Sequence, residues 1–185
     1  MTDLAIRDRN EYRRKLEANG FKLLGAGFYS MVFAYPNDTT RVLKLGTDDT
    51  WEPYVRWATE NGFAGNYAPR VYAYKRLSHW LYLASMERLD STVAGIQDER
   101  ERHDTMDAIF DVQRGHEEGY RFVDIKWPGL RCFVKRAQYE GFTGDWHMEN
   151  WMVKGPRLVL IDPQSENRTS PKRWRAVGPT IQAGR

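Results

Sequence analysis

Short, mostly apolar segments separated by polar turns recur through the first half of the chain, with the length and composition of strands. Segments rich in β-branched and aromatic side chains lie there between glycine, proline and asparagine turn signals. They cover residues 21–24, 31–35, 41–45, 69–74 and 80–86. This pattern predicts a five-stranded antiparallel sheet whose first turn is glycine-rich.

Helical patterns precede and interrupt this predicted sheet. Apolar positions among many charges predict a helix over residues 3–18. A second helix is expected after the third strand, with Thr50 as its N-cap, Pro53 in its first turn and its end near Asn61. The first half of the chain therefore predicts a sheet with one inserted helix.

The second half of the chain changes to helical composition. Residues 98–114 and 129–140 predict helices, and residues 151–161 predict a β-hairpin. We therefore expect an α+β protein with a sheet-rich lobe and a small helical lobe. The predicted parts are an N-lobe over residues 1–86, a minimal C-lobe over residues 87–165, and a polar, basic tail over residues 166–185.

Composition narrows the classes of function. No apolar run reaches the length of a membrane span, and the N-terminus lacks a signal-peptide pattern, so no membrane contact is expected. The single cysteine, Cys132, excludes an internal disulfide and is expected to pack as a small hydrophobic side chain. The formal net charge is +3, and the basic residues gather at the chain ends. We interpret those ends as solvated tails and not as a nucleic-acid surface.

Residues 25–32 read Gly-Ala-Gly-Phe-Tyr-Ser-Met-Val, between the first two predicted strands. Gly25 and Gly27 would let backbone amides approach phosphate oxygens, with Ser30 and Val32 completing the motif. An ordinary hairpin turn explains these glycines equally well. Lys44 on the third strand favours the phosphate interpretation, because a strand lysine behind such a loop can contact the α- and β-phosphates of ATP.

Two carboxylates on the following helix are candidates to pair with Lys44. Glu52 lies in the first turn, where it also suits the helix dipole, and Glu60 lies at the helix end. We favour Glu52, and surface positions for both are the alternative. Met86 and Glu87, at the end of the fifth strand, have the place of a hinge whose backbone would meet adenine.

Residues 144–150, Gly-Asp-Trp-His-Met-Glu-Asn, carry the most informative motif. Asp145 would act as the base or orienting group for an acceptor hydroxyl, and His147 would meet the γ-phosphate or stabilise the loop. Asn150 and, beyond the hairpin, Asp162 would hold Mg²⁺, which needs few side chains when phosphate oxygens complete its coordination. The order of these residues ahead of a hairpin favours phosphoryl transfer. Trp146 is expected to pack in the core, as is Trp151.

Together these motifs resemble the protein-kinase-like superfamily, over most of residues 19–165. The stretches around Gly25, Lys44, Asp145 and Asp162 are similar in particular to the early serine/threonine protein kinases of short-tailed bacteriophages. The resemblance implies transfer of the ATP γ-phosphate, with Mg²⁺, to Ser or Thr of host bacterial proteins in the host cytoplasm. Transcription and RNA-processing machinery are the substrates that the family implies.

Three departures from that family keep other functions open. Thr143 and Gly144 stand before Asp145 in place of His-Arg, which is closer to aminoglycoside and choline kinases. Asp162 is followed by Pro163, and the few residues beyond it imply no activation segment or peptide-docking helices. The alternatives are a small-molecule kinase and a catalytically silent kinase-like module that binds a host protein.

Overall fold

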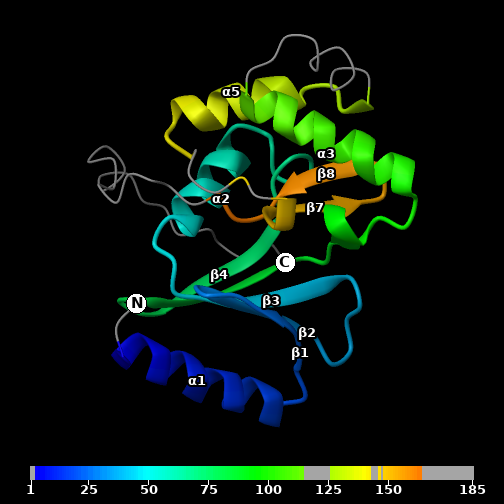
Figure 1. Cartoon of the computed structure of the whole chain (residues 1–185). Coiled ribbons are helices and arrows are strands. Elements are labelled where there is room, and N and C mark those ends of the chain that lie inside the picture. Colours follow the sequence, from blue (N-terminus) through cyan, green and yellow to red (C-terminus); the bar gives the residue numbers. More distant parts are fainter. Residues whose placement is uncertain (1–2, 115–125, 143–145, 147, 164–185) are drawn as a thin grey trace. The chain divides into compact units, whose positions relative to one another are not determined.

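The computed structural model describes residues 3–114, 126–142, 146 and 148–163. The chain forms two compact units. The first unit contains residues 3–49 and 70–88, and the second contains residues 50–69 and the described residues from 89 onward. The elements in chain order are α1 (Asp3–Ala18), β1 (Lys22–Ala26), β2 (Ser30–Ala34), β3 (Arg41–Gly46), α2 (Trp51–Glu60), β4 (Val71–Ser78), β5 (Leu81–Glu87), β6 (Ser91–Thr92), η1 (Val93–Gly95), α3 (Glu99–Arg114), α5 (Leu130–Tyr139), η2 (Met148–Asn150), β7 (Trp151–Lys154) and β8 (Arg157–Leu160) (Figure 1).

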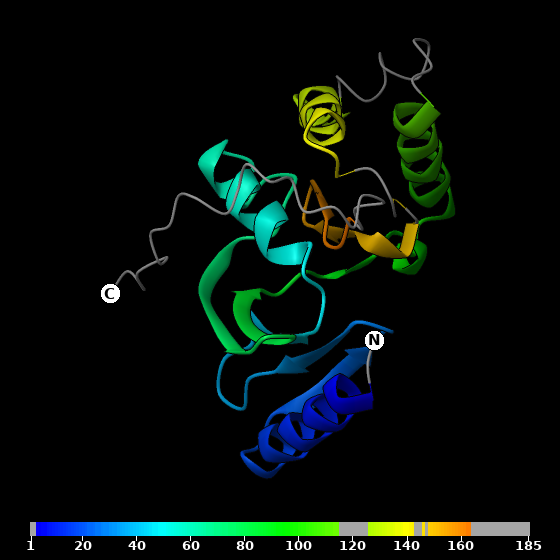
Figure 2. The same cartoon turned by 90° about the vertical axis from the view of Figure 1, so that its left-hand side faces the viewer.

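The first unit is a five-stranded antiparallel sheet with α1 along one face. Its strand order is β1-β2-β3-β5-β4. Helix α1 contacts β1, β3 and β5, and both Figure 1 and Figure 2 show it running beside the sheet. Tyr12 and Leu16 of α1 pack against a buried core. That core consists of Met31, Phe33, Leu43, Leu45 and Leu81. The predicted α+β fold class with a five-stranded antiparallel sheet is confirmed.

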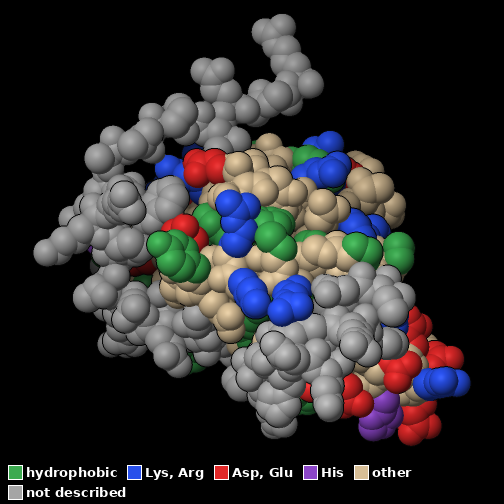
Figure 3. All heavy atoms as spheres, turned by 90° about the horizontal axis from the view of Figure 1, so that it is seen from above, with side chains coloured by type: hydrophobic (Ala, Val, Ile, Leu, Met, Phe, Trp, Pro, Cys, Tyr) green, Lys and Arg blue, Asp and Glu red, His purple; other side chains and the backbone are tan. Residues whose placement is uncertain are grey.

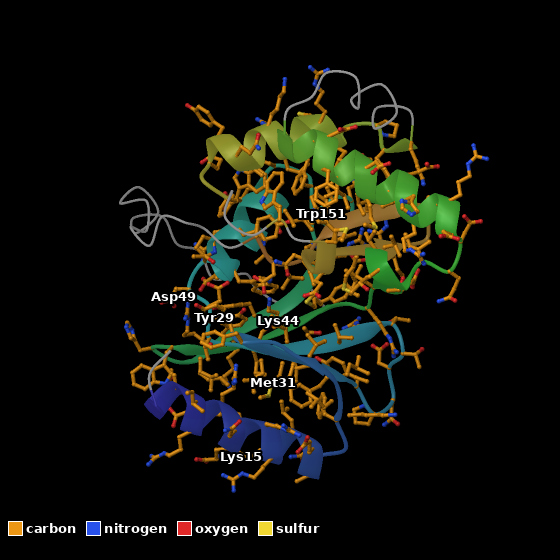
Figure 4. The ribbon with its side chains drawn as sticks, viewed as in Figure 1. Lys15, Tyr29, Met31, Lys44, Asp49 and Trp151 are labelled. Carbon is orange, nitrogen blue, oxygen red and sulfur yellow. The ribbon has the colours of Figure 1, made fainter. Side chains whose placement is uncertain are left out.

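The alternation of side chains gives the two faces of this sheet different roles. Leu43 and Leu45 of β3 belong to the core beneath α1, so Lys44 and Gly46 lie on the opposite face. Figure 4 shows Met31 on the side of α1. One strand therefore supplies both the core of the unit and the lysine that the sequence singled out.

The second unit is built on aromatic side chains. Trp57 of α2 lies 5.9 Å from the ring of Phe133 on α5 and 5.3 Å from that of Phe142. Figures 1 and 2 show α3 and α5 on the same side of the β7–β8 hairpin. The hairpin and both helices were predicted. The short strand β6, which pairs with β7 to make a three-stranded sheet, was not, because two residues carry no periodic signal.

The turn of this hairpin is held by one carboxylate. Asp90 accepts hydrogen bonds from Lys154 Nζ at 2.8 Å and from the Gly155 amide at 2.9 Å. These bonds, the lysine first, keep the pKa of Asp90 below its ordinary value. The closed end of the hairpin is thus fixed by the segment that precedes β6.

Helix α2 groups with the second unit and not with the sheet that precedes it in sequence. The predicted lobes over residues 1–86 and 87–165 differ from the two units in this segment, residues 50–69. The physical reason is that Trp51, Tyr54 and Trp57 find their aromatic and carbonyl partners in the second unit. As functional lobes, the predicted parts remain a prediction, and residues 166–185 lie outside the described residues.

Two expectations about single side chains have opposite outcomes. Trp146 and Trp151 are buried, so their predicted core packing is confirmed. The expectation for Cys132 is wrong, because its side chain is exposed. The helical period of α5 turns Phe133 and Ala137 inward and leaves Cys132 outside. Among the described residues, no helix has the length and apolarity needed to cross a membrane.

Gly46 is required by packing and not by backbone conformation. A Cβ at this position would lie 2.2 Å from Cζ of Tyr82, which is fully buried, so the ring would have to shift within the packed interior. We predict that Gly46→Ala lowers the free energy of unfolding by about 1–3 kcal/mol, measured by urea denaturation. Gly25→Ala is the matched control, because an added Cβ there meets nothing within 4 Å. Equal stability of the two variants would contradict this account.

Candidate functional site

The face of the first sheet that carries Lys44 is otherwise apolar around it. Lys44 pairs with Val32 on β2 and with Ala84 on β5, and Val42 pairs with Met86. The side chain of Lys44 is 4% exposed, which is unusual for a lysine. Apolar side chains around one cation are typical of nucleotide sites, in which they contact the base while the amine meets phosphate. Val32, Lys44 and Met86, three of the predicted ligands, are therefore on one face.

The glycine-rich loop is a tight turn between β1 and β2. The Gly27 amide donates to the Ser30 carbonyl at 2.8 Å and closes the turn. Neither Gly25 nor Gly27 has a positive φ, so neither is needed for an unusual backbone conformation. The space beside Gly25 is open to 4 Å. The fold does not require this glycine, whereas close approach of a phosphate would.

The predicted hinge residues are both buried at the end of β5. The Glu87 carboxylate accepts the Arg70 amide at 2.9 Å, and the Glu87 amide donates to the Arg70 carbonyl at 2.9 Å. Glu87 thus joins β5 to the segment that begins β4. Contact of Met86 and Glu87 with adenine remains a prediction.

Glu52 forms an ion pair within its own helix. Its carboxylate lies 2.7 Å from Nη2 of Arg56, one turn further along α2. Glu60, the alternative partner, is the last residue of α2 and is exposed. Glu52 belongs to the second unit and Lys44 to the first, and their pairing stays a prediction.

The two predicted metal ligands lie at the same open end of the β7–β8 hairpin. The Ile161 amide donates to the Asn150 carbonyl at 2.8 Å, which extends the hairpin by one pair beyond Trp151 and Leu160. Asp162 follows directly. Residues that are separated by the whole hairpin in sequence are therefore brought to one edge, and Oδ1 of Asp162 is buried there.

Two donors from α2 fix the chain just before Asp162. The Trp51 indole N–H donates to the Ile161 carbonyl at 3.0 Å, and the Tyr54 hydroxyl donates to the Leu160 carbonyl at 2.7 Å. Burial, and after it the negative charge of Asp162, raises the pKa of Tyr54 well above its ordinary value. The hydroxyl therefore keeps its proton and remains a donor. Sequence reasoning missed both residues, although their i, i+3 spacing in the first turn was a signal of one buried face.

Asp145 and His147, the predicted catalytic residues, lie outside the described residues. Their described neighbours are firmly held. The Trp146 indole N–H donates to the Phe142 carbonyl at 2.9 Å, and its ring meets that of Trp151 edge to face at 6.1 Å. Figure 4 shows Trp151 beside the start of β7, next to Asn150 in the chain.

The donor set at the hairpin suits Mg²⁺ that is shared with phosphates. Among the described residues, no group of three or more His, Cys, Asp and Glu is placed to hold a metal by itself. Asn150 and Asp162 offer one amide and one carboxylate oxygen donor, which is the sparse set that Mg²⁺ uses when phosphate oxygens and waters complete its shell. The residues therefore fit a metal that arrives with a nucleotide.

No family model and no curated protein matches this chain. Similar solved structures include two thermostable mutants of the aminoglycoside phosphotransferase APH(4)-Ia. The complex with AMP-PNP and hygromycin B is 17% identical over 54% of this chain and 36% of that chain, with a TM-score of 0.38. The complex with ADP and hygromycin B is 13% identical over 83% of this chain and 70% of that chain, with a TM-score of 0.40.

This chain thus spans 36% of the first of these two structures. At this level of identity and overlap, these two structures do not establish a function for this chain.

The bond from Tyr54 to β8 is testable by removing one oxygen atom. We predict that Tyr54→Phe lowers the free energy of unfolding by about 1–3 kcal/mol, because the buried Leu160 carbonyl loses its partner. Tyr139→Phe is the matched control, since Tyr139 is 89% exposed. Urea denaturation of both variants measures the difference. A loss of the same size in both would show that the buried bond contributes nothing specific.

Proposed function

We propose that this protein is an ATP- and Mg²⁺-dependent phosphotransferase. The observation that carries the proposal is the placement of Asn150 and Asp162 at one end of the β7–β8 hairpin. The apolar face around buried Lys44, behind a glycine loop with open space, supports it from the first unit. Each feature has an ordinary structural explanation, but the chemistry of phosphoryl transfer needs all of them.

In this proposal each residue has a role in binding or orientation. The Gly25–Ser30 turn covers the phosphates, Lys44 anchors the α- and β-phosphates, and Asn150 and Asp162 hold Mg²⁺. Bound Mg²⁺ supplies charge neutralisation at the phosphate oxygens. Asp145 orients the acceptor hydroxyl and takes its proton as the γ-phosphoryl group passes from ATP to the acceptor oxygen and ADP is released.

For the acceptor, we propose Ser or Thr of a host bacterial protein, in the cytoplasm of a host cell early in phage infection. This rests on the resemblance of the motifs around Lys44, Asp145 and Asp162. A small-molecule hydroxyl is the second candidate, favoured by Gly144 before Asp145. A cationic small molecule would need an acidic pocket. Over the described residues visible in Figure 3, Lys and Arg side chains are scattered among hydrophobic ones, and many but not all of the acidic side chains lie toward one edge.

The first test follows the transfer of label from γ-labelled ATP. The protein is incubated with labelled ATP and Mg²⁺, alone and with bacterial lysate, and label is measured separately on protein and on small molecules. We predict label on protein that falls at least about a hundredfold in Asp162→Asn, since the variant loses a charged metal ligand. Glu149→Gln is the matched control, because this exposed carboxylate lies beside Asn150 and should keep activity near wild type.

The outcomes separate the candidate functions. Label on small molecules alone would replace the protein acceptor by a metabolite or drug. ATP binding without any transfer would leave the silent binding module. Activity that survives Asp162→Asn would overturn the role given to that residue.

Gly25 offers a test that separates binding from stability. We predict that Gly25→Ala weakens Mg·ATP binding by about tenfold, because the added methyl occupies space through which a phosphate would approach the backbone. Its unfolding midpoint should be unchanged, since the methyl meets no protein atom within 4 Å. Titration calorimetry with ATP measures the affinity. Unchanged affinity would mean that this glycine belongs to an ordinary turn.

A further inference from the structure

We propose that Arg9 is a positioning residue that fixes the tip of the glycine loop from outside the sheet and thereby increases affinity for the triphosphate of ATP. The inference rests on the proposed function, because the loop is assigned there to phosphate. Its structural basis lies entirely within the first unit.

Helix α1 is a firmly anchored platform. Tyr12 and Leu16 pack against the core beneath the sheet. Oδ2 of Asp8 accepts a hydrogen bond from the Trp80 indole N–H at 3.1 Å, which ties the helix to the β4–β5 turn. A side chain that leaves α1 next to Asp8 is therefore held in a defined place.

Arg9 reaches from this platform to the loop. Its Nη1 donates to the Phe28 carbonyl at 2.6 Å, across 19 positions of sequence. The Phe28 side chain is 68% exposed, so packing of that ring does little to fix the tip. The hydrogen bond from Arg9 therefore holds the loop backbone at Phe28, which the exposed Phe28 ring does not do.

A second tie holds the adjacent carbonyl. The Thr47 amide donates to the Tyr29 carbonyl at 2.8 Å, and the Thr47 hydroxyl lies 3.0 Å from the same oxygen. Thr47 directly follows β3, the strand of Lys44. The two carbonyls at the tip are thus tied to α1 and to the lysine strand. This arrangement orients the loop backbone before any ligand is present, and less ordering is then needed on binding.

The choice of arginine is costly for a merely structural contact. Arg9 is partly buried, and this burial lowers its pKa. Among the described residues, its buried Nε has no hydrogen-bond partner. Partial burial of a cation with one unused donor costs some hydration free energy, which its single bond to the Phe28 carbonyl must offset. Positive charge behind a phosphate-binding loop has a further use, because it attracts the polyphosphate.

The test compares Arg9→Gln with Arg13→Gln. Both changes remove one positive charge from α1, but Arg13 pairs with Glu17 on the exposed side of the same helix. Dissociation constants for Mg·ATP and for adenosine are measured by titration calorimetry. We expect Arg9→Gln to weaken Mg·ATP binding by about tenfold, the value of one charge-assisted hydrogen bond, and to leave adenosine binding within about twofold of wild type. Arg9→Lys should restore part of the loss, and Arg13→Gln should match wild type.

Hydrogen exchange of the free protein reports the loop directly. Peptides covering residues 25–31 should exchange faster in Arg9→Gln than in Arg13→Gln. Unchanged exchange, or equal weakening of ATP and adenosine, would overturn the inference. If the wild-type protein does not bind ATP, the proposed function fails and the role in affinity fails with it. The exchange measurement then still decides whether Arg9 holds the loop.

Discussion

The indole of Trp51 and the hydroxyl of Tyr54 donate to the last carbonyls before Asp162, and the order of the second unit depends on these bonds. Both donors belong to buried aromatic side chains. If the hairpin moved away, each donor would be left buried without a hydrogen-bond partner, which costs free energy. The Leu160 amide also donates to the Tyr67 carbonyl, so both backbone polar groups of Leu160 are hydrogen-bonded. Hydrogen bonds from α2 and from Tyr67 therefore hold the end of β8, the segment that directly precedes Asp162.

In the first unit, packing of the sheet against α1 determines which face carries Lys44. Because side chains alternate along β3, the residues that bury the core beneath α1 are separated from Lys44 by one position only. A register slip of one residue would exchange them, so the packing of α1 also fixes the face that carries Lys44. Helix α1, which carries Arg9, therefore also helps to keep Lys44 on its face of the sheet.

In the proposed function, the residues of each unit supply binding groups and charge and little reactive chemistry, as phosphoryl transfer requires. The hairpin end offers oxygen donors and the sheet face offers one buried amine. The glycine loop offers backbone amides near open space. An acceptor hydroxyl needs only one carboxylate to orient it. The same residues therefore suit either a protein or a small-molecule acceptor.

The strands, helices and hairpin followed from the sequence, because period-2 and period-3.6 patterns and turn residues are local properties. The residues proposed for phosphate and metal, Lys44, Asn150 and Asp162, also stand in a recognisable order in the sequence, and their roles stay a prediction. The exposure of Cys132 was also available from the period of α5, and it was missed. Tertiary structure alone decided that α2 joins the second unit, that Trp51 and Tyr54 hold the chain before Asp162, and that Arg9 meets the loop. These depend on contacts between residues far apart in sequence, which no local pattern specifies.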